Sequence, residues 1–275
     1  MNGVGDRPGS EAPGPTDTTG RARLSGRRAL VTGGATGIGR ATALRLAADG
    51  AAVAVNYVGD RSPADGAVTE IAATGAPALA LEADVANEEA VARLFELAED
   101  GLGGPVDLLV NNAGVEAPYP LEELPLEEWE RVLSVNLTGP FLCTRELVRR
   151  IGGAQASVVM VSSVHELIPW PRFSHYCASK GGLKLFAQTA ARELAPRGIR
   201  VTLVAPGAIL TPINRELIEH PQKRREQEEQ IPLGRLGEPE EIAAAIAWIA
   251  GPEAGYVVGA TLFVDGGMAL YPRFV

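Results

Sequence analysis

Tyr176 and Lys180 lie four residues apart in the segment "SSVHELIPWPRFSHYCASK", which runs from Ser162 to Lys180. On a helix, residues at this spacing share one face, so the lysine ammonium group would lie near the phenol. A nearby positive charge favours the phenolate and lowers the pKa of a tyrosine from its usual value of about 10. Tyr176 is therefore predicted to be a general base, which takes the proton of an alcohol while hydride leaves the adjoining carbon.

Ser163 ends an apolar run at 157–163, upstream of Tyr176. Its hydroxyl could hydrogen-bond the reacting oxygen, whereas Ser162 would point to the opposite side of the strand. A Tyr and a Lys at this spacing also occur by chance in many helices. The chemistry therefore depends on the motifs that accompany the pair.

A glycine-rich loop, "TGGATGIG" from Thr32 to Gly39, directly follows the first apolar run and opens a helical pattern. Its glycines, Gly33, Gly37 and Gly39, permit a tight turn, and the free N–H groups of a helix N-terminus attract a pyrophosphate. Such a loop can also be an ordinary strand-to-helix turn. Alone it is a weak indication of dinucleotide binding.

Short apolar runs alternate with amphipathic stretches from Leu24 onward, which is typical of strand-helix units around a parallel sheet. At 88–100, apolar residues recur every three or four positions on one helical face: Val91, Leu94, Phe95 and Ala98. Residues 24–275 are predicted to form a single doubly wound α/β Rossmann domain with a seven-stranded parallel sheet flanked by helices. The Gly- and Pro-rich residues 1–23 are expected to be a disordered tail. The predicted strands are 28–33, 51–57, 76–85, 106–114, 157–163, 199–207 and 261–267.

The charge and cysteine content exclude several classes of partner. A net charge of -9 argues against nucleic acid and anionic membranes as partners, because both require a basic face. Cys143 and Cys177 lie far apart without a metal-ligand spacing, so neither a disulfide framework nor a metal site is expected. No segment reads as a membrane span or signal peptide, and the protein is expected to be cytoplasmic.

Several motifs in order make the chain resemble the short-chain dehydrogenase/reductase family: the T-G-x-x-x-G-x-G loop, "NNAG" at 111–114, Asn136 in "NLTG", the Ser-Tyr-Lys set and "PG" at 206–207. The resemblance implies a nicotinamide cofactor and four catalytic residues: Ser163, Tyr176, Lys180 and Asn136. In this scheme Asn136 holds a water molecule that is connected to Lys180. Lys180 would also bind ribose hydroxyls. The cofactor-binding residues implied by the loop motif and the resemblance are Gly33, Thr36, Gly37, Ile38, Gly39, Asp84, Val85, Asn112, Ala113, Gly114, Tyr176, Lys180, Pro206, Gly207, Ile209 and Thr211.

The end of the second predicted strand should decide between NAD and NADP, because a carboxylate there binds the ribose hydroxyls and a basic group accommodates a 2'-phosphate. Tyr57 and Val58 occupy these positions and decide neither way. Arg61 could reach a phosphate, but Asp60 beside it would oppose one. We expect NAD ahead of NADP. Asp84 would meet the adenine, although it could instead cap the following helix.

Beyond the family motifs, "SSVHELIPWPRFSHYCASKGG" and "TLFVDGGMALYP" are similar to segments of bacterial glucose 1-dehydrogenases of this family. That similarity implies a small-molecule sugar substrate, with oxidation of beta-D-glucose at C1 to glucono-1,5-lactone. Glu116, His165 and Asn214 are the candidate substrate residues. Their plainer alternatives are a solvated carboxylate, a half-buried histidine and a helix cap.

Other functions remain open at this stage. The same chemistry could serve another sugar, an alcohol or a 3-oxoacyl thioester, and a nucleotide-binding protein could keep the fold without turnover. An intact Ser163, Tyr176 and Lys180 argues against the last. The resemblance also implies a homotetramer in which the apolar C-terminal segment is buried between subunits.

Overall fold

A computed structural model of the protein describes residues 23–214 and 219–270. These residues contain a parallel sheet of seven strands in the order β3-β2-β1-β4-β5-β6-β7, which confirms the predicted fold class. The strands are β1 (Arg28–Val31), β2 (Ala52–Tyr57), β3 (Ala78–Glu82), β4 (Leu108–Asn111), β5 (Ala156–Val161), β6 (Ile199–Pro206) and β7 (Thr261–Val264). Strand order reverses between β1 and β4, and ligands bind doubly wound sheets at such a point, outside the carboxyl ends of the strands.

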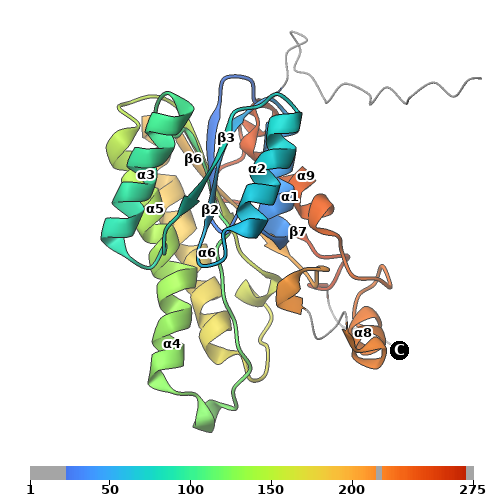
Figure 1. Cartoon of the computed structure of the whole chain (residues 1–275). Coiled ribbons are helices and arrows are strands. Elements are labelled where there is room, and N and C mark those ends of the chain that lie inside the picture. Colours follow the sequence, from blue (N-terminus) through green and yellow to red (C-terminus); the bar gives the residue numbers. More distant parts are fainter. Residues whose placement is uncertain (1–22, 215–218, 271–275) are drawn as a thin grey trace, which may run out of the picture.

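Helices cover both faces of the sheet. Figure 1 shows α1, α2 and α9 on one side and α3, α4 and α5 on the other. The described helices are α1 (Gly37–Ala48), α2 (Ser62–Ala73), α3 (Glu88–Leu102), α4 (Leu126–Leu133), α5 (Gly139–Arg150), α6 (Ser174–Leu194), α8 (Pro221–Glu228) and α9 (Pro239–Ala250).

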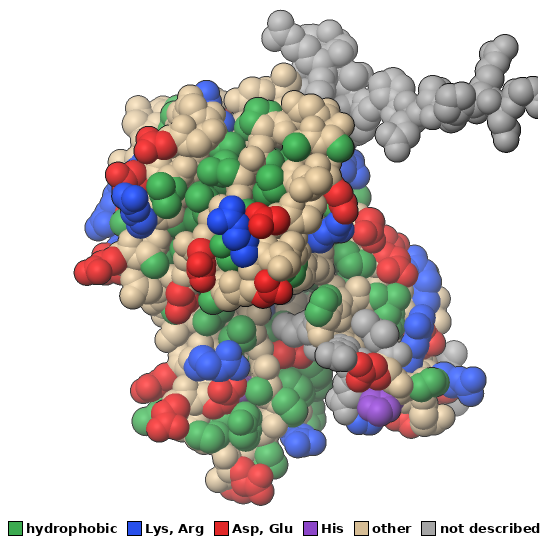
Figure 2. All heavy atoms as spheres, in the orientation of Figure 1, with side chains coloured by type: hydrophobic (Ala, Val, Ile, Leu, Met, Phe, Trp, Pro, Cys, Tyr) green, Lys and Arg blue, Asp and Glu red, His purple; other side chains and the backbone are tan. Residues whose placement is uncertain are grey.

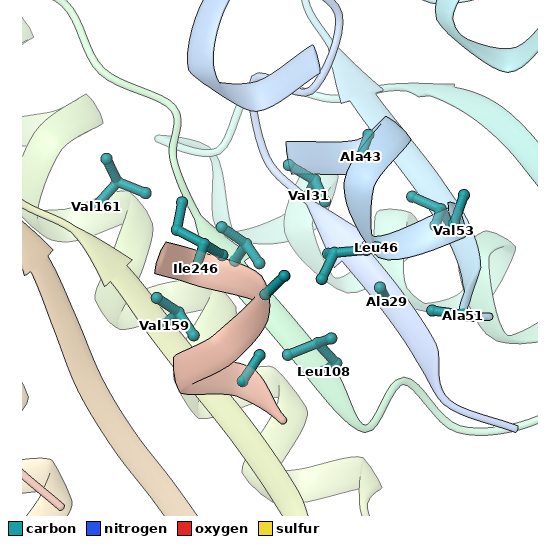
Figure 3. Close-up of a cluster of buried hydrophobic side chains, with 14 of the residues drawn as sticks. Ala29, Val31, Ala43, Leu46, Ala51, Val53, Leu108, Val159, Val161 and Ile246 are labelled. Atoms are coloured by element: carbon teal, nitrogen blue, oxygen red, sulfur yellow. The ribbon is translucent and has the colours of Figure 1, made fainter. Parts of the chain in front are cut away.

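The face under α1 and α9 is a closely packed apolar layer (Figure 3). Leu46 of α1 and Ile246 of α9 are fully buried against strand residues such as Val31. On the opposite face, α3 buries the four residues that the sequence predicts, Val91, Leu94, Phe95 and Ala98. Because the strands are packed between two apolar layers, the positions of their ends, where a site can form, are well defined.

The start of the described chain is anchored. Arg23 pairs with Glu253 at 3.2 Å, and Leu24 is fully buried. The prediction of a disordered tail lies outside the described residues, except for Arg23. On the face shown in Figure 2, acidic and basic side chains are interspersed rather than gathered into a basic patch. Among the described helices, none combines the length and apolarity needed to cross a bilayer.

Candidate active site

The glycine loop between β1 and α1 requires its glycines. Gly33 and Gly37 have φ values of 58° and 51°, in the left-handed region that favours glycine. A Cβ on Gly39 would lie 2.1 Å from the carbonyl oxygen of Gly33. Thr36 precedes α1 and makes no side-chain capping bond, so the first N–H groups of the helix have no cap from it. The loop can therefore bind an anionic group such as a pyrophosphate.

The "NNAG" segment holds this loop from the end of β4. The Asn112 amide donates to the carbonyl oxygens of Thr32 and Gly33, at 2.9 and 3.0 Å. In return, the Thr32 hydroxyl accepts from the backbone N–H groups of Asn112 and Ala113 at 2.9 and 3.0 Å. Thr32 is thus a structural partner of the site that the sequence prediction did not include, although it begins the glycine motif.

Asn56, near the end of β2, was also missed. It is 1% exposed, and its side-chain oxygen accepts from the Gly33 N–H at 3.2 Å while its amide donates to the Ala83 carbonyl at 2.9 Å. These bonds join the glycine loop to the end of β3. The signal in the sequence is a polar residue within an otherwise apolar strand, because a buried amide must find partners.

The residues predicted for the adenosine end lie at the ends of β2 and β3. Tyr57 is 6% exposed, whereas Arg61 is exposed and forms an ion pair with Asp65 at 3.0 Å. Val85 is buried. Asp84 is exposed and accepts from the Ala86 N–H at 2.9 Å.

The alternative that Asp84 caps the following helix is wrong. Asn87 caps α3, because its side chain accepts from the Ala90 N–H at 2.9 Å. Asp84 therefore remains available at the end of β3.

Ser163, Tyr176 and Lys180 come together beyond the end of β5. The Ser163 hydroxyl hydrogen-bonds the Tyr176 side chain. The Lys180 Nζ atom lies 5.5 Å from the centre of the Tyr176 ring and donates to the Val161 carbonyl at 3.0 Å. The predicted spacing on α6 thus places the amine against the phenol.

The pKa of Tyr176 differs from the sequence prediction. Burial, and then the charge of Glu116, raise the pKa of Tyr176, and the hydrogen bond from Ser163 only partly opposes them. Burial lowers the pKa of Lys180 to about 8, against the opposing charges of Glu116 and Glu166. The predicted lowering of the tyrosine pKa is wrong for the protein alone, because desolvation dominates the ionisation of the buried phenol.

Asn136 lies in a π-helical turn, Ser134–Thr138, between α4 and α5. Its side chain accepts from the Val115 N–H at 2.8 Å and donates to the Val115 carbonyl at 2.9 Å and the Ser179 hydroxyl at 3.2 Å. A Cβ placed on Gly114 would lie 3.5 Å from the Asn136 side-chain oxygen and 3.9 Å from the Lys180 Nζ atom. Asn136 therefore fixes the backbone of Val115, directly after "NNAG", close to Lys180.

The loop after β6 reaches the glycine loop from the other side. Pro206 ends β6, and the Gly207 N–H donates to the Val264 carbonyl at 3.1 Å. Ile209 is buried, with its side chain in the apolar core. A Cβ on Gly37 would lie 3.2 Å from the methyl carbon of Thr211, so Thr211 covers the start of α1.

Two of the three candidate substrate residues lie at the proton-transfer group. Glu116 is half-buried, and burial raises the pKa of its carboxyl to about 7 against the effect of Lys180. The His165 ring lies 6.2 Å from the Tyr176 ring, and burial lowers its pKa. Its Nδ1 atom lies 3.0 Å from the Ile168 carbonyl oxygen. Because a neutral imidazole must donate from Nδ1 to make this bond, its Nε2 atom is left as an acceptor.

Asn214, the third candidate, donates its amide to the Ile209 carbonyl at 2.8 Å. Its side chain therefore stabilises the loop after β6, and the structure gives it no contact with Tyr176 or Lys180.

Desolvation raises the thiol pKa of both Cys143 and Cys177, which disfavours the reactive thiolate. Cys143 is fully buried, and burial raises the pKa of its thiol to about 12. Within residues 23–214 and 219–270, no cluster of three His, Cys, Asp or Glu side chains could hold a metal ion.

The chain is similar to known dehydrogenases and reductases. A family model described as enoyl-(acyl carrier protein) reductase matches residues 33–269. The chain is 47% identical over 253 residues to the 3beta-hydroxysteroid dehydrogenase 1 of Eggerthella lenta, covering 91% of this chain and 97% of the relative. It is 42% identical over 252 residues to the glucose 1-dehydrogenase 2 of Bacillus subtilis, covering 90% and 97%. A solved Agrobacterium tumefaciens structure with bound NADP has a TM-score of 0.83 at 36% identity, over 90% of this chain and 98% of that one.

Proposed function

The chain belongs to the short-chain dehydrogenase/reductase family, and we propose that it oxidises beta-D-glucose at C1 to glucono-1,5-lactone with a nicotinamide cofactor. One observation carries the proposal: the segment Asn112–Gly114 touches the glycine loop on one side and approaches Lys180 on the other. A cofactor bound along the strand ends would thus place its reactive ring near Tyr176.

The glycine loop Thr32–Gly39, together with its neighbours Asn112–Gly114 and Thr211, forms a cradle that fits a dinucleotide. Gly33, Gly37 and Gly39 leave no room for side chains where the loop and its neighbours meet, and Thr36 leaves α1 uncapped. In the proposed complex, Thr36–Gly39 hold the pyrophosphate, Asp84 and Val85 the adenine, and Asn112–Gly114 the adenosine ribose. Lys180 binds the nicotinamide ribose, and the loop containing Pro206, Gly207, Ile209 and Thr211 covers the nicotinamide.

In the proposed reaction the substrate C–H bond breaks and its C1–OH group becomes a carbonyl. An oxidised nicotinamide held by these residues would supply the hydride acceptor and a positive charge. Tyr176 takes the hydroxyl proton, and Ser163 holds the same oxygen by a hydrogen bond. Lys180, with a pKa of about 8, can carry a charge beside the phenolate at neutral pH. The raised pKa of Tyr176 in the protein alone thus makes the base dependent on the positive charges around it.

Glucose is the first substrate candidate, with Glu116 and His165 as partners for its hydroxyls. A neutral His165 with a free Nε2 atom can accept from a hydroxyl, and an ionised Glu116 can do the same. A site built for such bonds rejects substrates that leave them empty. Asn214 acts in this proposal by shaping the loop after β6.

A 3beta-hydroxysteroid is the second candidate. It is favoured by the relative at 47% identity and by aromatic rings beside Tyr176. Trp170 stacks on His165 at 4.4 Å and on Phe173 at 3.6 Å, and its ring centre lies 6.1 Å from that of Tyr176. These rings provide apolar surface that a steroid could contact.

For the cofactor we propose NAD ahead of NADP. Arg61, the basic residue predicted near the end of β2, is already paired with Asp65, and Asp60 lies next to it. A 2'-phosphate would have to break that ion pair or bind beside a carboxylate.

The deciding experiment follows the absorbance of the reduced nicotinamide with glucose, other sugars, a 3beta-hydroxysteroid or a secondary alcohol as hydride donor. The reverse reaction is followed with a 3-oxoacyl thioester, and each assay is run with both cofactors. We expect the highest kcat/KM with glucose and NAD. A preference for the steroid by tenfold or more would replace glucose with the second candidate. Turnover of none of these, with cofactor binding intact, would favour the non-catalytic alternative.

We also propose a homotetramer. The described edge strand β7 is partly exposed, and three large apolar residues near it, Trp248, Tyr256 and Val258, are 39%, 103% and 42% exposed. Light scattering should give four times the chain mass of 28.8 kDa. A monomer mass would overturn this proposal.

A further inference from the structure

Glu166 carries a buried carboxylate that the proposed reaction does not use. Its side chain is 0% exposed. One oxygen, Oε1, lies 3.2 Å from the Lys184 Nζ atom and accepts from the Thr261 hydroxyl at 3.1 Å. The other, Oε2, is buried and has no hydrogen-bond partner within the described part of the chain.

These contacts join three elements. Glu166 ends the 3-10 turn Val164–Glu166, which begins directly after Ser163. Its backbone N–H donates to the Ser163 carbonyl at 3.0 Å, and the Ser163 hydroxyl accepts from the His165 N–H at 3.2 Å. Lys184 lies on α6 one helical turn after Lys180, and Thr261 begins β7. The carboxylate therefore connects the serine turn to the tyrosine helix and to the sheet.

Stability alone is a poor explanation for this group. Burying a carboxylate is costly unless it is paired and hydrogen-bonded, and Oε2 is left without a partner. Apolar side chains of similar size often replace a buried ion pair with no loss of stability. What an apolar side chain could not supply is a directional link to both Lys184 and Thr261.

We propose that Glu166 is a positioning residue, which fixes the turn carrying Ser163 and His165 against the helix carrying Tyr176 and Lys180. This proposal rests on the proposed function, because the relative position of Ser163 and Tyr176 matters only if both contact the substrate. The charge of Glu166 also supports a charged Lys180, since it opposes the lowering of the lysine pKa.

The test is the variant Glu166→Gln in the full-length protein. It keeps the shape and an acceptor for Thr261 but loses the charge that holds Lys184. Lys184 is 30% exposed and can turn to water, so its charge is not stranded. Glu193→Gln is the matched control, because it removes an exposed carboxylate from α6, the helix that carries Lys184.

Two measurements are made on each variant. We expect kcat of Glu166→Gln to fall about tenfold to a hundredfold, since a shift of about 1 Å in a reacting group can cost that much. The KM for the cofactor should change less than about twofold, because the glycine loop is not touched. Amide hydrogen exchange should speed up in residues 163–170 and not in the glycine loop. Glu193→Gln should behave as wild type in both measurements.

Unchanged exchange in residues 163–170, or faster exchange with unchanged kcat, would overturn the positioning role. A parallel loss of kcat and of cofactor binding would also overturn it, since that marks a general structural defect. If Glu166→Gln fails to fold, Thr261→Val removes a single bond and must show the same pattern more weakly. If the wild-type protein turns over no substrate, the proposed function fails, while hydrogen exchange still decides whether the carboxylate holds the turn.

Discussion

Replacing Gly39 with alanine tests the cofactor cradle directly. The added Cβ would lie 2.1 Å from the Gly33 carbonyl oxygen and 2.5 Å from the Asn112 Nδ2 atom. Favourable contacts between non-bonded heavy atoms require about 3.5 Å, so the loop must move by more than about 1 Å. That movement separates Gly33 from the Asn112 amide, which now donates to it at 3.0 Å.

Overpacking of this kind costs about 1–3 kcal/mol, and the weakened hydrogen bond adds about 1 kcal/mol. For a chain of this size we expect Gly39→Ala to lower Tm by about 3–10 °C. Cofactor affinity should fall at least about tenfold, which corresponds to about 1.4 kcal/mol. Calorimetry of unfolding and a fluorescence titration with NADH measure the two effects.

Gly66→Ala is the control. Gly66 lies within α2, and a Cβ there meets nothing within 4 Å. Alanine in a helix is more stable than glycine by about 0.5–1 kcal/mol, so this variant should melt at the same temperature or slightly higher and bind NADH normally. The steric account of the cradle is refuted if Gly39→Ala melts and binds NADH like Gly66→Ala.

Three further predictions concern the proton-transfer site. Tyr176→Phe should lower kcat/KM at least about a hundredfold, because a proton acceptor is lost, while the dissociation constant for NADH changes far less, because the glycine loop is intact. Full activity in steady-state assays would exclude Tyr176 as the base. Glu116 has a native pKa of about 7 against about 4.3 when unfolded, so the native state loses stability as pH rises between these values. Glu116→Gln should therefore exceed the wild type by about 1–3 kcal/mol in urea unfolding at pH 8 and match it near pH 4, and an equal difference at both pH values would contradict the assigned burial. Asn136→Ala leaves the half-buried Val115 N–H and carbonyl without their protein partners and should cost about 1 kcal/mol per lost hydrogen bond, seen as a lower Tm; an unchanged Tm would show that these two bonds contribute nothing.

Much of the fold could be predicted from local patterns. The apolar runs at 28–33 and 157–163 became β1 and β5, and the periodic residues around Phe95 became the buried face of α3. Side-chain direction repeats every two residues in a strand and about every 3.6 in a helix, so burial leaves a period in the sequence. The order of the motifs then identified the family.

The partners within the site could not be predicted in this way. Asn56 bonds Ala83, and Glu166 bonds Thr261, across long stretches of chain. The number of residues between the two members of each pair follows no rule, because it depends on how many residues the chain needs to connect the elements that carry them. Only the packed sheet brings these atoms within hydrogen-bond distance.

The sequence by itself determined which groups could move a proton, because Tyr176 and Lys180 are four positions apart and therefore lie on one helical face. The tertiary structure alone decided how those groups ionise. The loop after β4 brings Glu116 to Tyr176 and Lys180 on α6, and desolvation there raises the pKa of Tyr176 and of Glu116 and lowers that of Lys180. Burial is a property of everything that surrounds a side chain, so no local spacing can encode it.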